Sequence, residues 1–167
     1  MIEQDTIRLL RECDAGVKMG IAAIDDVLES VSNDKFRERL GELKDEHQQI
    51  NADIQKLLGK YHDDGKEPNP IAKGMSQMKT IFRVAADKSD STIADLMTDG
   101  CNMGVKSLSK YLNQYKAADE ESKEMTKKLI KSESDFAGLF DDYDVNSNKL
   151  GSTVAKRNEK LVKLLNG

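Results

Sequence analysis

Two segments of the chain each hold half of a metal-binding motif. His47 interrupts an otherwise apolar helical stripe, and a buried imidazole needs a metal ion or a hydrogen-bonding neighbour. Two-metal sites in helical bundles use Glu-x-x-His, because a spacing of three places both ligands on one inward face. Lys44 stands where His47 would need its glutamate, and Phe136 stands where Glu133 would need its histidine. Each segment therefore keeps the ligand that the other has lost.

Two more helices would have to supply one carboxylate each to complete such a site. Asp14 and Asn102 stand at the corresponding places, each one residue after a cysteine, and only Asp14 is charged. These side chains can meet only if four helices pack with the relevant faces turned inward.

An internal repeat supports four helices of this kind. The run from Cys13 to Lys18 recurs 88 residues later, from Cys101 to Lys106, and apolar positions around both copies alternate in spacings of three and four. The stripe that contains His47 likewise recurs 89 residues later. We interpret the chain as one helical hairpin used twice. Cys13 and Cys101 would then lie at equivalent inward positions as small buried hydrophobic side chains.

The periodicity and the turn residues predict an all-α domain at residues 1–148. Its four helices are expected at about 3–32, 34–61, 91–116 and 119–143. Residues 32–34 should cap the second helix, and Asp90 or Ser91 the third. A long crossover at 62–90 separates the two hairpins, and it holds both prolines and a short amphipathic helix at about 71–86. Two tight hairpins joined by a long crossover are typical of one class of four-helix bundle.

The sequence predicts a separate, basic C-terminal extension at residues 149–167. Leucine and valine side chains face one side of the expected helix, and lysine and arginine side chains face the other. Such a helix could pack on the bundle, pair with a second subunit or touch an acidic surface.

The composition excludes several classes of function. The chain of 167 residues has no tryptophan, 5% aromatic and 34% charged residues, which favours helices over strands. Its net charge of -4 argues against a nucleic-acid partner, because phosphate binding needs a concentrated basic face. No apolar stretch approaches the roughly 20 residues of a membrane span, and the start lacks the features of a signal peptide. We therefore expect a cytoplasmic protein.

Two motifs resemble those of a known family. The Cys-x-x-Gly-x-Lys runs and the run Phe36-x-x-x-Leu40-x-x-Leu43-x-x-x-His47 are similar to a bacterial family of ferritin-like proteins of unknown function, over roughly residues 3–143. The resemblance implies a ferritin-like four-helix bundle with a metal site. The corresponding positions here are Asp14, Lys44, His47, Asn102, Glu133 and Phe136.

These positions are poor in metal ligands. Only Asp14, His47 and Glu133 could bind a cation, whereas two adjacent metal ions need about four carboxylates. We expect no cofactor, or at most a single metal ion. In one interpretation, the Lys44 ammonium fills the vacated space and pairs with Glu133 or Asp14. In the other, Lys44 and Glu133 are solvated and His47 bonds to a neighbour.

The residues thus predict a non-enzymatic interaction or structural protein, built on a bundle whose metal site has degenerated. The alternative is a metal-binding ferritin-like protein, for redox chemistry or metal storage, that uses Asp14, His47 and Glu133. Expected partners are a second copy of the chain, through a bundle face or the C-terminal helix, or another protein. No residue pattern identifies that partner.

Overall fold

A computed structural model describes residues 2–66 and 89–140, and within these ranges the chain is entirely helical apart from its turns and connections. Its helices are α1 (Ile2–Leu28), α2 (Asp34–Gly59), α4 (Asp90–Gln114) and α5 (Glu120–Phe140). The prediction of an all-α domain with four long helices is confirmed for this part of the chain. The expected crossover helix at 71–86 and the extension at 149–167 lie outside the described residues.

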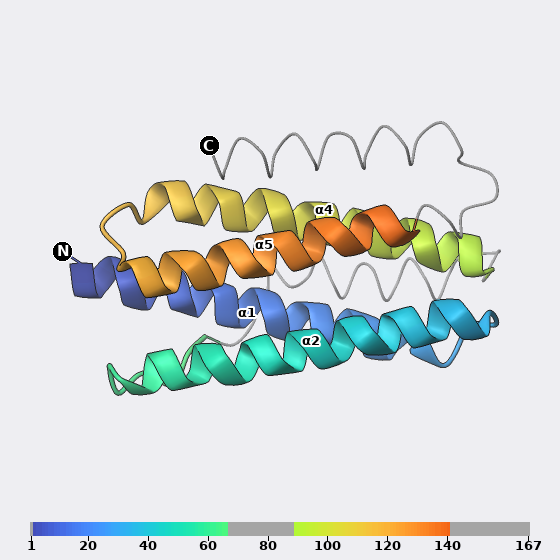
Figure 1. Ribbon diagram of the computed structural model, residues 1–167, viewed down its shortest axis with the longest axis horizontal. Coiled ribbons are helices and arrows are strands. Elements are labelled where there is room, and N and C mark those ends of the chain that lie inside the picture. Colours follow the sequence, from blue (N-terminus) through green and yellow to red (C-terminus); the bar gives the residue numbers. More distant parts are fainter. Residues whose placement is uncertain (1, 67–88, 141–167) are drawn as a thin grey trace.

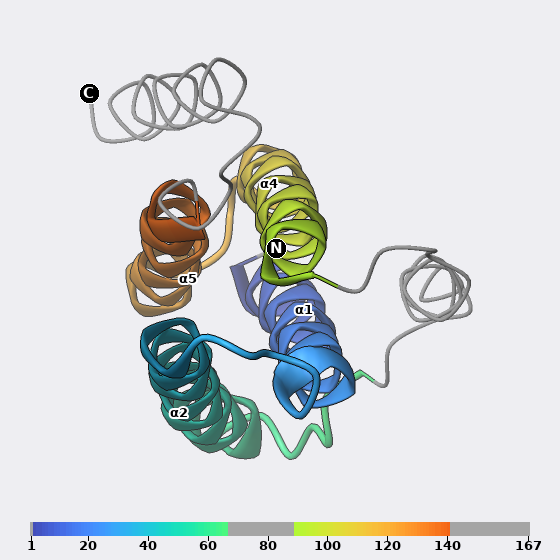
Figure 2. The same cartoon turned by 90° about the vertical axis from the view of Figure 1, so that its right-hand side faces the viewer.

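The four helices form two antiparallel hairpins, α1–α2 and α4–α5 (Figure 1). The end of α2 and the start of α4 lie at opposite ends of the bundle, so these two helices run in the same direction (Figure 1). Helix α1 packs against α2, α4 and α5, and α5 also packs against α2 and α4 (Figure 2). In the described part of the chain, no helix is both long enough and apolar enough to cross a membrane.

The core consists of two clusters of buried side chains, one toward each end of the bundle. The first contains Phe36, Leu40, Met97, Cys101 and Phe136 among others. The second contains Leu10, Cys13, Ile50, Ile54 and Leu129 among others. Cys13 and Cys101 are 0% and 3% exposed and not disulfide-bonded, as predicted from the repeat. Burial raises the pKa of the Cys13 thiol to about 12, so this thiol remains protonated, and its Sγ lies 3.2 Å from the buried Thr126 Oγ1.

Side-chain caps fix where the helices begin. The Asn33 side chain accepts a hydrogen bond from the Phe36 amide at 3.0 Å and caps α2, as predicted. The cap of α4 is Ser89, so the expectation of Asp90 or Ser91 is wrong. Asp90 instead accepts hydrogen bonds from the amides of Ser32 and Asn33, at 2.8 and 2.7 Å. This carboxylate ties the first hairpin turn to the start of α4, and therefore joins the two hairpins.

The segment after α2 folds back onto α1. The Arg11 guanidinium forms a bidentate ion pair with Asp63, whose side chain is 11% exposed. Two residues later Gly65 adopts a φ of +87°, which favours glycine. A side chain at position 65 would also collide with the carboxylate of Asp14 on α1. Glycine is therefore required for the chain to leave α2 against α1.

The ion pair between Arg11 and Asp63 should make the free energy of unfolding depend on pH. Hydrogen bonds from Arg11 lower the pKa of the Asp63 carboxyl below its usual range. Because the folded-state pKa is lower than the unfolded one, the pair stabilises the fold above about pH 4 and loses this effect as pH falls through the lowered value. We expect Asp63→Asn to reduce the free energy of unfolding by up to about 1 kcal/mol at neutral pH. Urea titrations should show the difference vanish near pH 2 or below; a difference that persists there would contradict the assignment.

Substitution of Gly65 tests the contact with Asp14. Gly65→Ala should lower the free energy of unfolding by about 1–3 kcal/mol, because it combines an unfavourable φ with a steric clash. Gly41 lies inside α2, and a methyl group added there would meet no atom within 4 Å, which makes Gly41→Ala the matched control. That variant should gain about 0.5–1 kcal/mol of stability. Equal effects of the two substitutions in urea denaturation would refute the steric argument.

Candidate functional site

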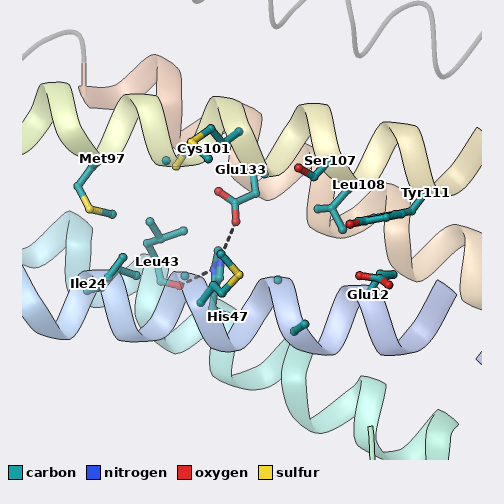
Figure 3. A pocket seen from close by; sticks show the side chains of 18 residues that line it. Glu12, Ile24, Leu43, His47, Met97, Cys101, Ser107, Leu108, Tyr111 and Glu133 are labelled. Carbon is teal, nitrogen blue, oxygen red and sulfur yellow. Dashed lines mark hydrogen bonds and ion pairs between the residues drawn. The ribbon is translucent and has the colours of Figure 1, made fainter. Parts of the chain in front are cut away.

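His47 on α2 and Glu133 on α5 meet at the centre of the bundle. The imidazole Nε2 lies 2.8 Å from Glu133 Oε1, and the two residues are 1% and 8% exposed. Figure 3 shows this pair between the two halves of the molecule, with the carboxylate directed at the ring. The two ligand types that the half-motifs retain are therefore brought together, although they are 86 residues apart in sequence.

The hydrogen bonds of His47 determine how many protons the pair holds. Its Nδ1 lies 3.1 Å from the Leu43 carbonyl oxygen, and a carbonyl can only accept, so Nδ1 carries a hydrogen. Nε2 and Glu133 Oε1 must then share one proton, because two acceptors would repel each other at 2.8 Å. The pair is either imidazolium with carboxylate or neutral imidazole with carboxylic acid. In both forms its net charge is zero.

Glycines on the other two helices make room for the pair. A methyl group at Gly20 of α1 would lie 2.7 Å from His47 Cδ2, and one at Gly104 of α4 would lie 3.3 Å from Glu133 Cδ. All four helices thus contribute to this centre. Neither glycine was identified as a site residue from the sequence. The available signal was their mid-helix position, where glycine costs about 0.5–1 kcal/mol relative to alanine unless packing requires it.

A cleft between α1 and α4 leads to this pair. It has a volume of about 200 Å³, and its lining includes Met19, Met97 and Met103 together with several glycines and alanines. Figure 3 shows Ile24, Leu43 and Met97 near one end of the cleft, and Glu12 and Tyr111 near the other. His47 and Glu133 lie between these ends. The site is therefore an apolar cleft with one buried polar pair along its length.

Cys101 lies beside Glu133 in the same cleft. Burial, and then the neighbouring Glu133 carboxylate, raise the pKa of the Cys101 thiol well above its usual range. The thiol therefore stays protonated at neutral pH, and a protonated thiol is a poor nucleophile. Neither cysteine supplies a reactive thiolate.

Asp14, the third expected metal ligand, forms its hydrogen bonds away from His47 and Glu133. Its carboxylate is fully buried and accepts hydrogen bonds from donors on α2 and on the segment that follows it. These donors are Asn51 Nδ2 at 3.0 Å, Gln55 Nε2 at 2.7 Å and the Lys66 amide at 2.9 Å, and Lys18 Nζ forms an ion pair at 2.9 Å. The structure does not bring Asp14 together with His47 and Glu133. Its role in this arrangement is to hold the end of α2 against α1.

Lys44 does not form the pair that the sequence suggested. Its Nζ lies 2.6 Å from Asp25 Oδ1 on α1, at a position where Asp25 is half exposed, and Glu133 is bonded to His47 instead. The expectation of a pair with Glu133 or Asp14 is therefore wrong. Asn102 is partly buried on α4 and does not line the cleft, and Phe136 belongs to the first core cluster. Within residues 2–66 and 89–140, no group of three or more His, Cys, Asp and Glu side chains is placed to hold a metal ion.

Removing one partner of the His47–Glu133 pair should lower the free energy of unfolding strongly, whereas replacing both with apolar side chains should change it little. His47→Met and Glu133→Met each leave the other polar group buried without its partner, and we expect each to lose about 3–5 kcal/mol of unfolding free energy. The double variant removes both groups and should recover to within about 1–2 kcal/mol of the wild type. Urea denaturation of the wild type, the two single variants and the double variant measures this double-mutant cycle.

A surface ion pair on α5 provides the control for the cycle. Lys131 and Asp135 lie 2.6 Å apart and both are largely exposed. Lys131→Met should change stability by less than about 1 kcal/mol. Additive losses in the His47 and Glu133 double variant would show that the two side chains do not act as a unit.

Comparisons with known proteins do not assign the chain to a family. The resemblance to ferritin-like proteins consequently remains an interpretation of the residues. No protein-family model matches the sequence, and neither a curated protein nor a solved structure shows significant similarity to it.

Proposed function

We propose that this chain is a non-enzymatic interaction or structural protein on a ferritin-like bundle, in which a hydrogen-bonded pair has replaced the metal centre. The observation that carries the proposal is the 2.8 Å contact between His47 Nε2 and Glu133 Oε1. Each of these side chains is the surviving half of a Glu-x-x-His motif. They meet where a metal ion would lie between the two hairpins, and they satisfy each other.

The directions of the helices support the ferritin-like interpretation. In such bundles the second and third long helices run the same way, because a long connection returns the chain to the opposite end. Helices α2 and α4 have this relation (Figure 1). The inward positions of Cys13 and Cys101 agree with the internal repeat on which the interpretation is based.

The state of the other polar groups supports a role without catalysis. Asp14 is held by four donors, the Cys101 thiol has a raised pKa, and the ring nitrogens of His47 are both engaged. A general base or nucleophile needs a lone pair directed at a substrate. The polar atoms of Asp14, Cys101 and His47 instead interact with other parts of the bundle. We place the protein in the cytoplasm, with a second copy or another protein as its partner.

The second candidate function is metal binding for redox chemistry or storage. It is favoured by the approach of an imidazole and a carboxylate from facing helices, which is how many bundles hold a metal ion. A metal ion could displace the shared proton and use both groups, with further ligands from a partner subunit. Asp14 would have to give up its donors to take part.

Metal content separates these two functions. Protein purified without chelators should contain far less than one iron or manganese per chain by elemental analysis. Stoichiometric metal that is lost in His47→Gln would overturn the proposal and favour the second candidate.

A restored ligand set tests whether the centre descends from a metal site. Lys44→Glu with Phe136→His would complete Glu-x-x-His on both α2 and α5, and this double variant should take up iron or manganese. Lys56→Glu makes the same charge change at an exposed position of α2 and should not. If the double variant folds with unchanged stability yet binds no metal, the degenerate-site interpretation is wrong.

A further inference from the structure

The charged groups that line the cleft between α1 and α4 are already paired. Glu133 lies 2.8 Å from His47, and Glu12 forms an ion pair with Lys66 at 2.7 Å. The described residues that line the cleft include no lysine or arginine. An ion that entered the cleft would lose its hydration without meeting an opposite charge that is free to pair with it. A complementary molecule is therefore uncharged.

Open space lies beside the central pair, where α1 passes Leu108 of α4. Gly16 is one helical turn before Gly20 on α1. Among the described side chains, a methyl group added at Gly16 would meet Leu108 Cδ2 alone, at 3.9 Å. Packing against the described residues therefore does not require glycine at position 16, although glycine weakens a helix relative to alanine. Its effect is to leave a space that a ligand can occupy.

The lining of this part of the cleft is mostly apolar. It consists of Ala15, Met19, Leu108 and the ring of Tyr111, and Figure 3 shows Leu108 and Tyr111 to one side of the central pair. Tyr111 follows Gly104 by seven residues on α4, which is about 10 Å along the helix axis. The whole cleft has a volume of about 200 Å³, and apolar cavities of about 150 Å³ can hold benzene. A short unbranched alkyl chain fits this part of the cleft.

One polar atom faces the same space. A methyl group at Gly104 would lie 3.5 Å from Glu133 Oε1, and one at Gly20 would lie 3.8 Å from the same oxygen. Oε1 therefore faces a gap between two residues that have no side chain. A carboxylate has about four lone-pair sites, and the hydrogen bonds to His47 and the Cys101 thiol leave part of this capacity unused. A hydroxyl group can donate to Oε1 without displacing the imidazole.

We propose that the cleft between α1 and α4 binds a small neutral alcohol, whose hydroxyl group donates to Glu133 Oε1 and whose alkyl chain lies along Gly16 and Leu108. Neither His47 nor Glu133 gains or loses a proton, so the site is neutral before and after binding. Burial of the alkyl chain supplies most of the affinity, and the hydrogen bond fixes the orientation. The site goes beyond the proposed function, since alcohol binding and metal content are measured separately.

A series of ligands tests the class of molecule on the full-length protein. In NMR titrations, 1-hexanol should shift the methyl signal of Met19, which lines the cleft, and not that of Met125, which lies outside the lining. 1-Methoxyhexane keeps the oxygen but cannot donate a hydrogen bond, so it should bind about tenfold more weakly. Hexylamine and hexanoate are charged at neutral pH, and both should bind more weakly than 1-hexanol.

Two glycine variants locate the binding. Gly16→Leu should fill the space beside Leu108 and abolish the binding of 1-hexanol. Gly41→Leu adds the same side chain to α2, where a methyl group would meet no atom within 4 Å, and it should leave binding unchanged. Circular dichroism shows whether both variants keep their helices. The methyl shifts in the wild type locate the ligand independently if Gly16→Leu does not fold.

Four results would overturn the proposal. Equal binding of 1-methoxyhexane and 1-hexanol would mean that the hydroxyl group is not recognised. Tighter binding of hexylamine or hexanoate would mean that the ligand is charged. Binding that survives Gly16→Leu, or that shifts Met125 and not Met19, would place the ligand elsewhere. No detectable binding of 1-hexanol would show that the cleft is not an alcohol site, which is the result expected if a second copy of the chain fills it.

Discussion

The buried contact between His47 and Glu133 is the constraint on which the rest of the structure depends. A histidine and a glutamate removed from water are unfavourable alone, and they become acceptable because each completes the hydrogen bonding of the other. Their contact requires a particular distance between α2 and α5. It also requires glycine at position 20 of α1, since a methyl group there would lie 2.7 Å from His47 Cδ2, and it leaves little room at Gly104 of α4, where a methyl group would lie 3.3 Å from Glu133 Cδ. One polar contact thus sets the spacing of all four helices.

Other polar contacts extend this constraint to both ends of the bundle. At one end Asp90 accepts from the amides of the first hairpin turn, and at the other the Asp119 amide donates to Thr6 at 2.8 Å. Asp14 holds the segment after α2 against α1. In each case a short side chain accepts a hydrogen bond from a backbone amide in a connection outside the helices. These contacts fix the register of the hairpins, whereas the two apolar clusters supply the bulk of the burial.

The candidate site was only partly predictable. The residues left open whether Glu133 is solvated or faces the interior, and the structure places it 8% exposed beside His47. Periodicity indicates which face of a helix a residue occupies, but not what that face contacts. The hydrogen-bonding and ion-pair partners of Lys44 and Asp14 could not be predicted from periodicity. Lys44 has a long flexible side chain that reaches Asp25, outside the centre, and Asp14 meets its donors only because α2 and the segment after it pass beside it. Pairing between helices depends on their rotation and separation, which one helix does not specify.

The sequence alone determined the class and the repeat: four long helices, their approximate limits and the inward faces that carry Cys13 and Cys101. These features are local, since they follow from the spacing of apolar residues and from caps within a few positions along the chain. Only the tertiary structure decided that one shared proton joins His47 to Glu133, and that a cleft between α1 and α4 opens beside them. The physical reason is that hydrogen-bond geometry and empty space arise between helices, from distances that no single segment encodes.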